Sequence, residues 1–377
     1  MLSAVAGSRR VLGGVMMTGA TLAAIGCAGT TALEVKKVRA VAEPPANVAL
    51  HLKIKRPDGK AVTLLATDFK VSEDGKQIPS KKLKRALLPA SLVVERYVMV
   101  AVDLSGPLVD SEYLSTLQDV VASFSERAGK DTHFALSVFD GDGLKPFVRF
   151  EDTEIKPGLA GMRRFRPHNR TVDLWSNFMA SLDALDAAAT GSTALEHSSA
   201  LVFMTDRRDK AGKHTLDEAN TRLQASKADV FMIGIGDAID REELQRLARP
   251  DAFFAEKFRD LGKPFDQAAA ELEAERGQDY VFSYCSLARP GKKPTRHKLE
   301  LEIETKEWSG EVEHEFSSKT FEKGTCDPRR KVEFGSRTSK ADKTDEKGGG
   351  DEGDEKVKKR KPRPAEEEGG GGEPDET

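Results

Sequence analysis

Two apolar segments that each end in an aspartate constrain the fold of this chain more than any other feature. The runs 97–103 and 200–206 are rich in Val, Leu, Met and Phe, as expected for strands buried on both faces. They end at Asp103 and Asp206, and Ser105 follows the first. Ligands of open α/β sheets bind at the carboxyl ends of strands. The sequence therefore predicts an oxygen-rich site there, with Thr171 as a further candidate.

Between residues 97 and 276, apolar strand-like runs alternate with amphipathic stretches. This alternation predicts an α/β domain with a mostly parallel, doubly wound sheet. The predicted strands are 97–103, 133–139, 146–150, 200–205, 230–235 and 252–255. The predicted helices are 110–127, 173–188, 215–226, 240–248 and 261–276.

The spacing of Asp103-Leu-Ser105-Gly, a distant Thr171, and a strand ending in Thr205-Asp206 resembles the metal-ion-dependent adhesion site of von Willebrand factor A (VWA) domains. The resemblance implies a Rossmann-like VWA domain over 95–284. It also implies that Asp103, Ser105, Thr171 and Asp206 hold Mg²⁺, or Mn²⁺ or Ca²⁺, some of them through water. Such oxygen ligands suit a hard cation. In this family, the carboxylate of a protein partner completes the coordination shell.

The chain departs from this family pattern at two positions and in one spacing. Pro107 stands where the family has a second Ser, so one side-chain oxygen is missing. Arg207 stands where Gly usually follows the aspartate of the second strand, and its guanidinium is able to replace a cation electrostatically. The segment from Thr171 to Asp173 is one residue longer than usual. The predicted metal site is therefore degenerate.

The first 27 residues are typical of an export signal, because Arg9 and Arg10 precede an apolar run that is too short to span a membrane. Small residues before Cys27 resemble the lipobox of bacterial lipoproteins, which implies that Cys27 is lipidated. The alternative is an ordinary cleaved signal peptide. Residue 28 is Ala rather than Asp, which favours the outer membrane. We expect an exported, lipid-anchored envelope protein, with 28–46 as a tether.

The other two cysteines, Cys285 and Cys326, remain as a pair in an oxidising compartment. A disulfide between them is the economical interpretation. Two unrelated buried thiols are the alternative that the sequence leaves open. No Cys/His spacing indicates zinc.

Alternating apolar residues and turn sequences predict a small antiparallel β unit over 47–94 and a β hairpin within 285–334. Two arrangements remain open. The two β pieces pair, so that the VWA domain is an insertion in a β-sandwich, or the hairpin packs on the VWA domain. Residues 335–377 are rich in Lys, Glu, Asp and Gly, which predicts a disordered charged tail.

No catalytic set is recognisable in the sequence, because it has no nucleophile elbow, zinc-protease motif or phosphate loop. The seven histidines are scattered, and we expect each at the surface or half buried: His51, His133, His168, His197, His214, His297 and His314. The net charge of −3 gives no case for nucleic-acid binding. We therefore expect a non-enzymatic protein that binds an envelope or extracellular partner through its VWA domain. The alternative is a metal-free scaffold whose β elements or tail make the contacts, and a hydrolase is the least favoured function.

Overall fold

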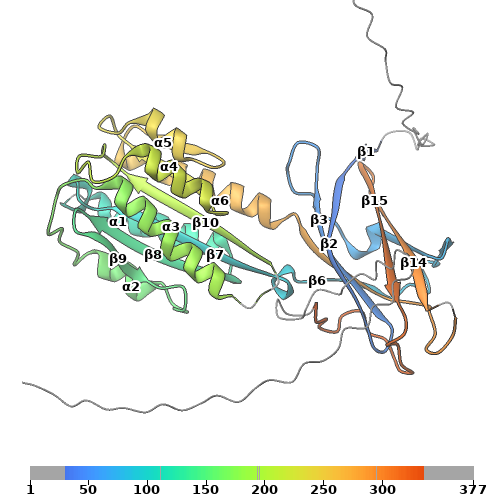
Figure 1. Ribbon diagram of the computed structural model, residues 1–377. Helices are drawn as coiled ribbons and strands as arrows, with labels where there is room; N and C mark the ends of the chain where they lie inside the picture. The colour runs from blue at the N-terminus through green and yellow to red at the C-terminus, as the bar shows by residue number, and fades with distance from the viewer. Residues whose placement is uncertain (1–29, 111, 193, 195, 294, 335–377) are drawn as a thin grey trace, which may run out of the picture. The chain divides into compact units, whose positions relative to one another are not determined.

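The computed structural model describes residues 30–334, apart from positions 111, 193, 195 and 294. Its central feature is a six-stranded sheet in the order β12-β11-β10-β7-β8-β9 (Figure 1). All neighbouring strands are parallel except β9, which runs antiparallel to β8. The strands are β7 (Val94–Asp103), β8 (Thr132–Asp140), β9 (Gly143–Val148), β10 (Glu196–Thr205), β11 (Asp229–Ile235) and β12 (Ala252–Ala255).

Helices cover both faces of this sheet. One layer contains α1 (Tyr113–Ala128), α2 (Lys156–Met162) and α6 (Gly262–Arg276), and the other contains α3 (Leu174–Gly191), α4 (Leu216–Ala225) and α5 (Arg241–Leu247). Side chains of β7 alternate between the layers, so that Val100 packs with the first and Met99 with the second. Two buried faces explain the continuous apolar run. The predicted doubly wound α/β fold is confirmed.

The remaining strands form two antiparallel-rich sheets that enclose a separate core. The first has the order β2-β3-β13-β6 and the second β1-β15-β14-β4-β5. Their bounds are β1 (Thr31–Ala32), β2 (Glu34–Glu43), β3 (Asn47–Lys55), β4 (Phe69–Glu73), β5 (Lys76–Gln77), β6 (Arg85–Leu88), β13 (Asp279–Cys285), β14 (Arg296–Glu304) and β15 (Trp308–Ser317). Phe282 from the first sheet stacks on Phe69 from the second, with ring centroids 4.7 Å apart. Short 3-10 turns occupy Ala66–Asp68, Ala90–Leu92, Pro107–Asp110 and Phe258–Asp260.

The two β pieces of the sequence pair with each other. Strand β14 lies beside β4, and β13 lies between β3 and β6. The doubly wound domain is therefore inserted between β6 and β13 of a β-sandwich. The sequence predicts residues 279–284 as the end of the inserted domain, but they form most of β13, and Tyr280, Phe282 and Tyr284 pack in the sandwich core instead.

The prediction of a tether over 28–46 is wrong for most of its length, because Thr31–Ala32 and Glu34–Glu43 form β1 and β2 of the sandwich. The pairing of β2 with β3 shifts register between Lys37 and Arg39. This irregularity interrupts the two-residue alternation that identifies a strand in sequence. The segment therefore lacks a clear strand pattern although it is paired over most of its length.

A disulfide joins Cys285 at the end of β13 to Cys326, with 5.8 Å between the Cα atoms. It holds the segment after β15 against the sandwich. Phe321 and Val332 of that segment are buried, and the side-chain amide of Asn47 donates a hydrogen bond to the carbonyl of Asp327 at 2.6 Å. The predicted pairing of the two cysteines is thus present in the structure.

Close packing at β11 yields a first prediction, for a Gly234→Ala substitution. A Cβ at this position would lie 2.6 Å from Ile239 Cδ1 and 2.9 Å from Leu244 Cδ1. We expect a loss of about 1–3 kcal/mol in the free energy of unfolding, because a filled core must shift to accept a methyl group. Gly191→Ala in α3 is the matched control, since a Cβ there meets no atom within 4 Å. Urea denaturation of both variants measures the difference, and equal stabilities would contradict the packing argument.

Candidate metal site at the carboxyl edge of the sheet

Asp103 lies at the end of β7 and is fully buried. The hydroxyl and the backbone N–H of Ser105 both donate to its Oδ1, at 2.6 and 2.9 Å. The Thr205 hydroxyl, at the end of the neighbouring strand β10, donates to Oδ2 at 2.8 Å. Burial raises the pKa of Asp103, although these hydrogen bonds favour its charged form. Three donors therefore fix this carboxylate between two strands.

Asp206, the residue after β10, is only 5% exposed. Neither of its carboxylate oxygens has a hydrogen-bond partner within residues 30–334 as described. Burial, followed by the negative charge of Asp103, raises the pKa of Asp206 to about 7, while Arg207 lowers it. Buried carboxylates are normally paired or bound to metal. This side chain thus has unused ligand capacity beside a second buried carboxylate.

The backbone between Ser105 and Pro107 approaches Asp206 closely. A Cβ on Gly106 would lie 2.6 and 2.9 Å from the two Asp206 carboxylate oxygens and 2.8 Å from Arg207 Nε. Only glycine leaves room for both side chains at this position. Pro107 begins the 3-10 turn Pro107–Asp110 and supplies no side-chain oxygen. The site is therefore compact and lacks one of the family's ligands.

Thr171 lies in an exposed segment before α3. Its carbonyl oxygen would be 2.6 Å from a Cβ on Gly141, which places the segment beside the turn between β8 and β9. The loop after β10 also contacts this segment, because the backbone N–H of Lys210 donates to the Val172 carbonyl at 2.9 Å. Among the described residues, no hydrogen bond joins Thr171 to Asp103, Ser105 or Asp206. Its assignment as a ligand stays a prediction.

A second group of potential metal ligands, which the sequence analysis missed, comprises Asp140, Asp142 and His168. One ligand atom from each lies within 4.8 Å of the others. Asp140 is already paired with Lys145 Nζ at 2.9 Å and accepts the backbone N–H of Asp142 and His168. Burial alone would raise the pKa of Asp140, but these partners lower it overall. The buried member of this group, Asp140, is therefore electrostatically satisfied without a cation. His168 is 28 residues from Asp140 in sequence, so only the fold brings it to the two aspartates.

Two histidines depart from the expectation of surface or half-buried positions. His51 is fully buried in β3, with Nε2 2.9 Å from Asp279 Oδ1, and Arg96 pairs with the other oxygen of Asp279 at 2.7 Å. His297 in β14 is also buried, between Asp74 and Ser318. Both lie on strands of the sandwich, and their imidazole rings are buried because these strand positions face the interior. They hold the structure together rather than form a ligand set.

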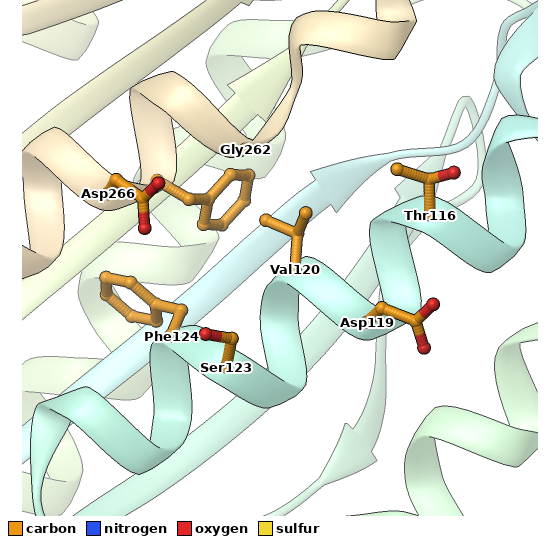
Figure 2. Close-up of a pocket in the computed structure, with 8 residues that line it drawn as sticks. Thr116, Asp119, Val120, Ser123, Phe124, Gly262 and Asp266 are labelled. Atoms are coloured by element: carbon orange, nitrogen blue, oxygen red, sulfur yellow. The ribbon is translucent and has the colours of Figure 1, made fainter.

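A separate groove lies between α1 and α6, with a volume of about 250 Å³. Figure 2 shows Ser123 and Phe124 of α1 on one side of it and Asp266 of α6 on the other. The lining residues are Thr116, Asp119, Val120, Ser123, Phe124, Gly262, Phe265 and Asp266. None of the predicted metal ligands belongs to this lining. The groove is distinct from the carboxyl edge.

Comparison with known proteins supports the assignment of the central domain. The family model described as von Willebrand factor type A domain matches residues 98–267. No curated protein matches the sequence.

Solved structures similar to this chain include proximal thread matrix protein 1 from the mussel byssus with a zinc-occupied MIDAS motif. It has 18% identity and a TM-score of 0.41, and the match covers 50% of each chain, so this chain spans about half the length of the mussel protein. A von Willebrand factor type A structure from Catenulispora acidiphila has 9% identity, covers 76% of this chain and 73% of its own, and has a TM-score of 0.42. The ArnB paralog VWA2 from Sulfolobus acidocaldarius has 12% identity, coverages of 75% and 74%, and a TM-score of 0.36.

The matched range contains all six helices and all six strands of the doubly wound domain except the first residues of β7 and the end of α6. Asp103 and Asp206 lie at the carboxyl ends of the adjacent parallel strands β7 and β10, as the sequence motif requires. Residues 98–267 of this chain form a von Willebrand factor type A domain.

Proposed function

We propose that this protein binds a protein partner at the carboxyl edge of its VWA domain, through a divalent cation. The observation that carries the proposal is the Asp206 carboxylate, which is buried beside Asp103 and whose two oxygens accept no hydrogen bond within the part of the chain that the structure describes. Two like charges in a low-dielectric setting repel each other strongly. Either a proton or a cation relieves this repulsion, and a hard cation with oxygen ligands fits the donor set.

The residues around the site have distinct roles in this proposal. Asp206 provides a carboxylate ligand, and Ser105 provides a hydroxyl whose orientation is fixed by its 2.6 Å bond to Asp103. Asp103 supplies negative charge behind that hydroxyl, and Thr171 is the further predicted ligand. A divalent cation held by these residues would supply a positive charge to which the carboxylate of a partner protein would bind. Pro107 has no side-chain oxygen, so water would occupy the coordination position that the family fills with Ser. We therefore expect weak binding, with dissociation constants of about 10⁻⁴–10⁻³ M, as in extracellular Ca²⁺-binding modules.

Isothermal titration of Mg²⁺ and Mn²⁺ into the full chain tests this proposal. Titration of the wild-type protein should give a heat of binding with a stoichiometry of one cation per chain. Asp206→Asn or Ser105→Ala should abolish this heat of binding. Asp237→Asn is the matched control, because Asp237 is an exposed carboxylate in the segment after β11 and has no place in the site. Binding that survives Asp206→Asn, or no binding to the wild type, would refute the cation-dependent function.

A metal-free scaffold is the second candidate function. It is favoured by Pro107 and by the guanidinium of Arg207, whose Nε lies 3.9 Å from Asp206 Oδ1. In that case the contacts with partners lie on the helices, the sandwich or the tail. Partner binding that is indifferent to chelator would support this function over the first.

We further propose that the protein is anchored to the bacterial envelope through a lipid on Cys27, which lies outside the described residues, with the outer membrane as the favoured location and an envelope or extracellular protein as partner. The charged tail predicted for residues 335–377 also lies outside the described residues. Among the described residues, no helix is long and apolar enough to cross a membrane. Expression of the full chain in a bacterium with lipoprotein processing should give a lipidated, membrane-bound protein. Cys27→Ser should release it from the membrane fraction, and retention there would contradict the proposal.

A further inference from the structure

Arg207 lies against the carboxylate that the proposed function requires. Its Nε is 3.9 Å from Asp206 Oδ1, which is ion-pair distance but too long for a hydrogen bond. The side chain is 28% exposed, and no closer acidic partner is found for it among the described residues. The guanidinium therefore faces Asp206 without a tight geometry that would hold it there.

The backbone of Arg207 is tied to the centre of the site. Its N–H donates to the Thr205 hydroxyl at 3.1 Å, and that hydroxyl donates to Asp103. The missing side chain of Gly106 leaves the space in which the guanidinium lies, since a Cβ there would be 2.8 Å from Arg207 Nε. The fixed backbone and the open space together direct the arginine over the carboxylate pair.

The next residue provides a natural comparison. The Arg208 side chain is 60% exposed, and it lies 3.8 Å from Asp240 Oδ2 while its Nε donates to the Ile239 carbonyl at 3.3 Å. Arg208 thus faces α5, away from Asp206. The two neighbouring arginines carry the same charge but only one of them is placed to neutralise the site.

We infer that Arg207 is a built-in counter-ion that neutralises Asp206 in the metal-free protein and competes with a divalent cation for it. This inference rests on the proposed function for the cation, and it assigns Arg207 a role that the family motif does not contain. Arginine keeps its charge throughout the physiological pH range, so the competition is permanent. Cation binding requires the guanidinium to move away, towards the solvent to which it is already partly exposed. Arg207 thereby sets a low cation affinity and makes the site responsive to the local cation concentration.

Substitution of each arginine in the full chain tests this inference. Arg207→Ala should raise the affinity for Mg²⁺ and Mn²⁺ by about tenfold, since it removes a positive charge at about 4 Å from a ligand. Arg208→Ala should leave the affinity unchanged, and Arg207→Lys should leave it closer to wild type than to Arg207→Ala. Equal affinities in Arg207→Ala and wild type would overturn the inference while leaving the proposed function intact.

A double-mutant cycle in chelator separates the two claims. Arg207→Ala should lower the melting temperature when Asp206 is present, and should have little effect in the Asp206→Asn background. If no variant binds a cation, the proposed function fails, but this coupling still supports Arg207 as counter-ion. Equal effects of Arg207→Ala in both backgrounds would overturn the inference by itself.

Discussion

Asp206→Asn should stabilise the metal-free protein by about 2 kcal/mol at about pH 8. Folding raises the pKa of this carboxyl from 3.8 to about 7, because burial and the charge of Asp103 disfavour its ionised form. An amide of the same shape carries no charge, so it avoids the electrostatic penalty. The electrostatic penalty that the substitution removes is at most about 4 kcal/mol. Burial of an amide without hydrogen-bond partners costs about 1–3 kcal/mol, which reduces the net increase in the free energy of unfolding.

The pH dependence of this effect follows from the sign of the pKa shift. Below about pH 4 the carboxyl is protonated in both folded and unfolded chains, so ionisation does not affect stability. Between about pH 4 and 7 the unfolded chain releases the proton while the folded chain keeps it, and the free energy of unfolding falls. Above the folded pKa of about 7 the penalty is constant.

Urea denaturation of wild type and Asp206→Asn in chelator, across this pH range, measures the effect. The variant should be the more stable protein at about pH 8 and should lose that advantage near pH 4. Asp237→Asn, at an exposed position, should track the wild type throughout. A variant that is equally destabilised at every pH would show that the Asp206 carboxylate has a hydrogen-bond partner in the folded state and would contradict the prediction.

Removal of the disulfide should have the second large effect. Cys285 and Cys326 are 41 residues apart, and a crosslink of that span restricts the unfolded chain by about 4 kcal/mol in the chain-entropy model. The double variant Cys285→Ser/Cys326→Ser should lose stability of this order. The loss should appear in the sandwich, because the bond ties β13 to the segment that covers β3.

Reductant provides the control for this prediction. Wild-type protein treated with reductant should unfold at the urea concentration of the double variant, and reductant should not affect the variant. Cation binding at the VWA domain should persist in both, since neither cysteine lies in that domain. An unchanged unfolding midpoint after reduction would contradict the prediction.

The sequence was sufficient to predict the strands whose apolar runs are uninterrupted. The strands that end in Asp103 and Asp206 are buried on both faces, and their apolar runs are visible without a structure. Parallel pairing of β7 with β10 then brings the two carboxylates together, as the motif predicted. The juxtaposition at the carboxyl edge was therefore accessible from residue order alone.

Other elements depend on contacts that residue order does not reveal. Helix α2 was not predicted, because Pro157, Gly158 and Gly161 are typical of a turn. In the fold, a Cβ on Gly158 would lie 2.2 Å from the Phe147 carbonyl oxygen, so glycine is what allows α2 to pack on β9. Strand β13 follows the VWA domain directly in sequence but pairs with β3, more than 200 residues earlier. Long-range pairing of this kind overrides the local pattern.

The sequence predicted that Asp103 and Asp206 lie at the same edge of the sheet, but not the electrostatics of their surroundings. Sequence alone indicated that Arg207 is near Asp206, yet the orphaned carboxylate oxygens and the close approach of Gly106 are properties of the folded backbone. The paired state of Asp140 with Lys145, which distinguishes the second acidic group from the first, also becomes visible only in the structure.

A comparison of unfolding curves for wild type and Asp206→Asn, each in chelator and in Mg²⁺, tests the central claim most directly. If Asp206 is a buried cation ligand that accepts no hydrogen bond among the described residues, Asp206→Asn is the more stable protein in chelator and the wild type is the more stable protein in Mg²⁺. Ligand binding to the folded state alone produces that reversal. The same order of stability in both conditions would contradict a cation site at this edge of the sheet.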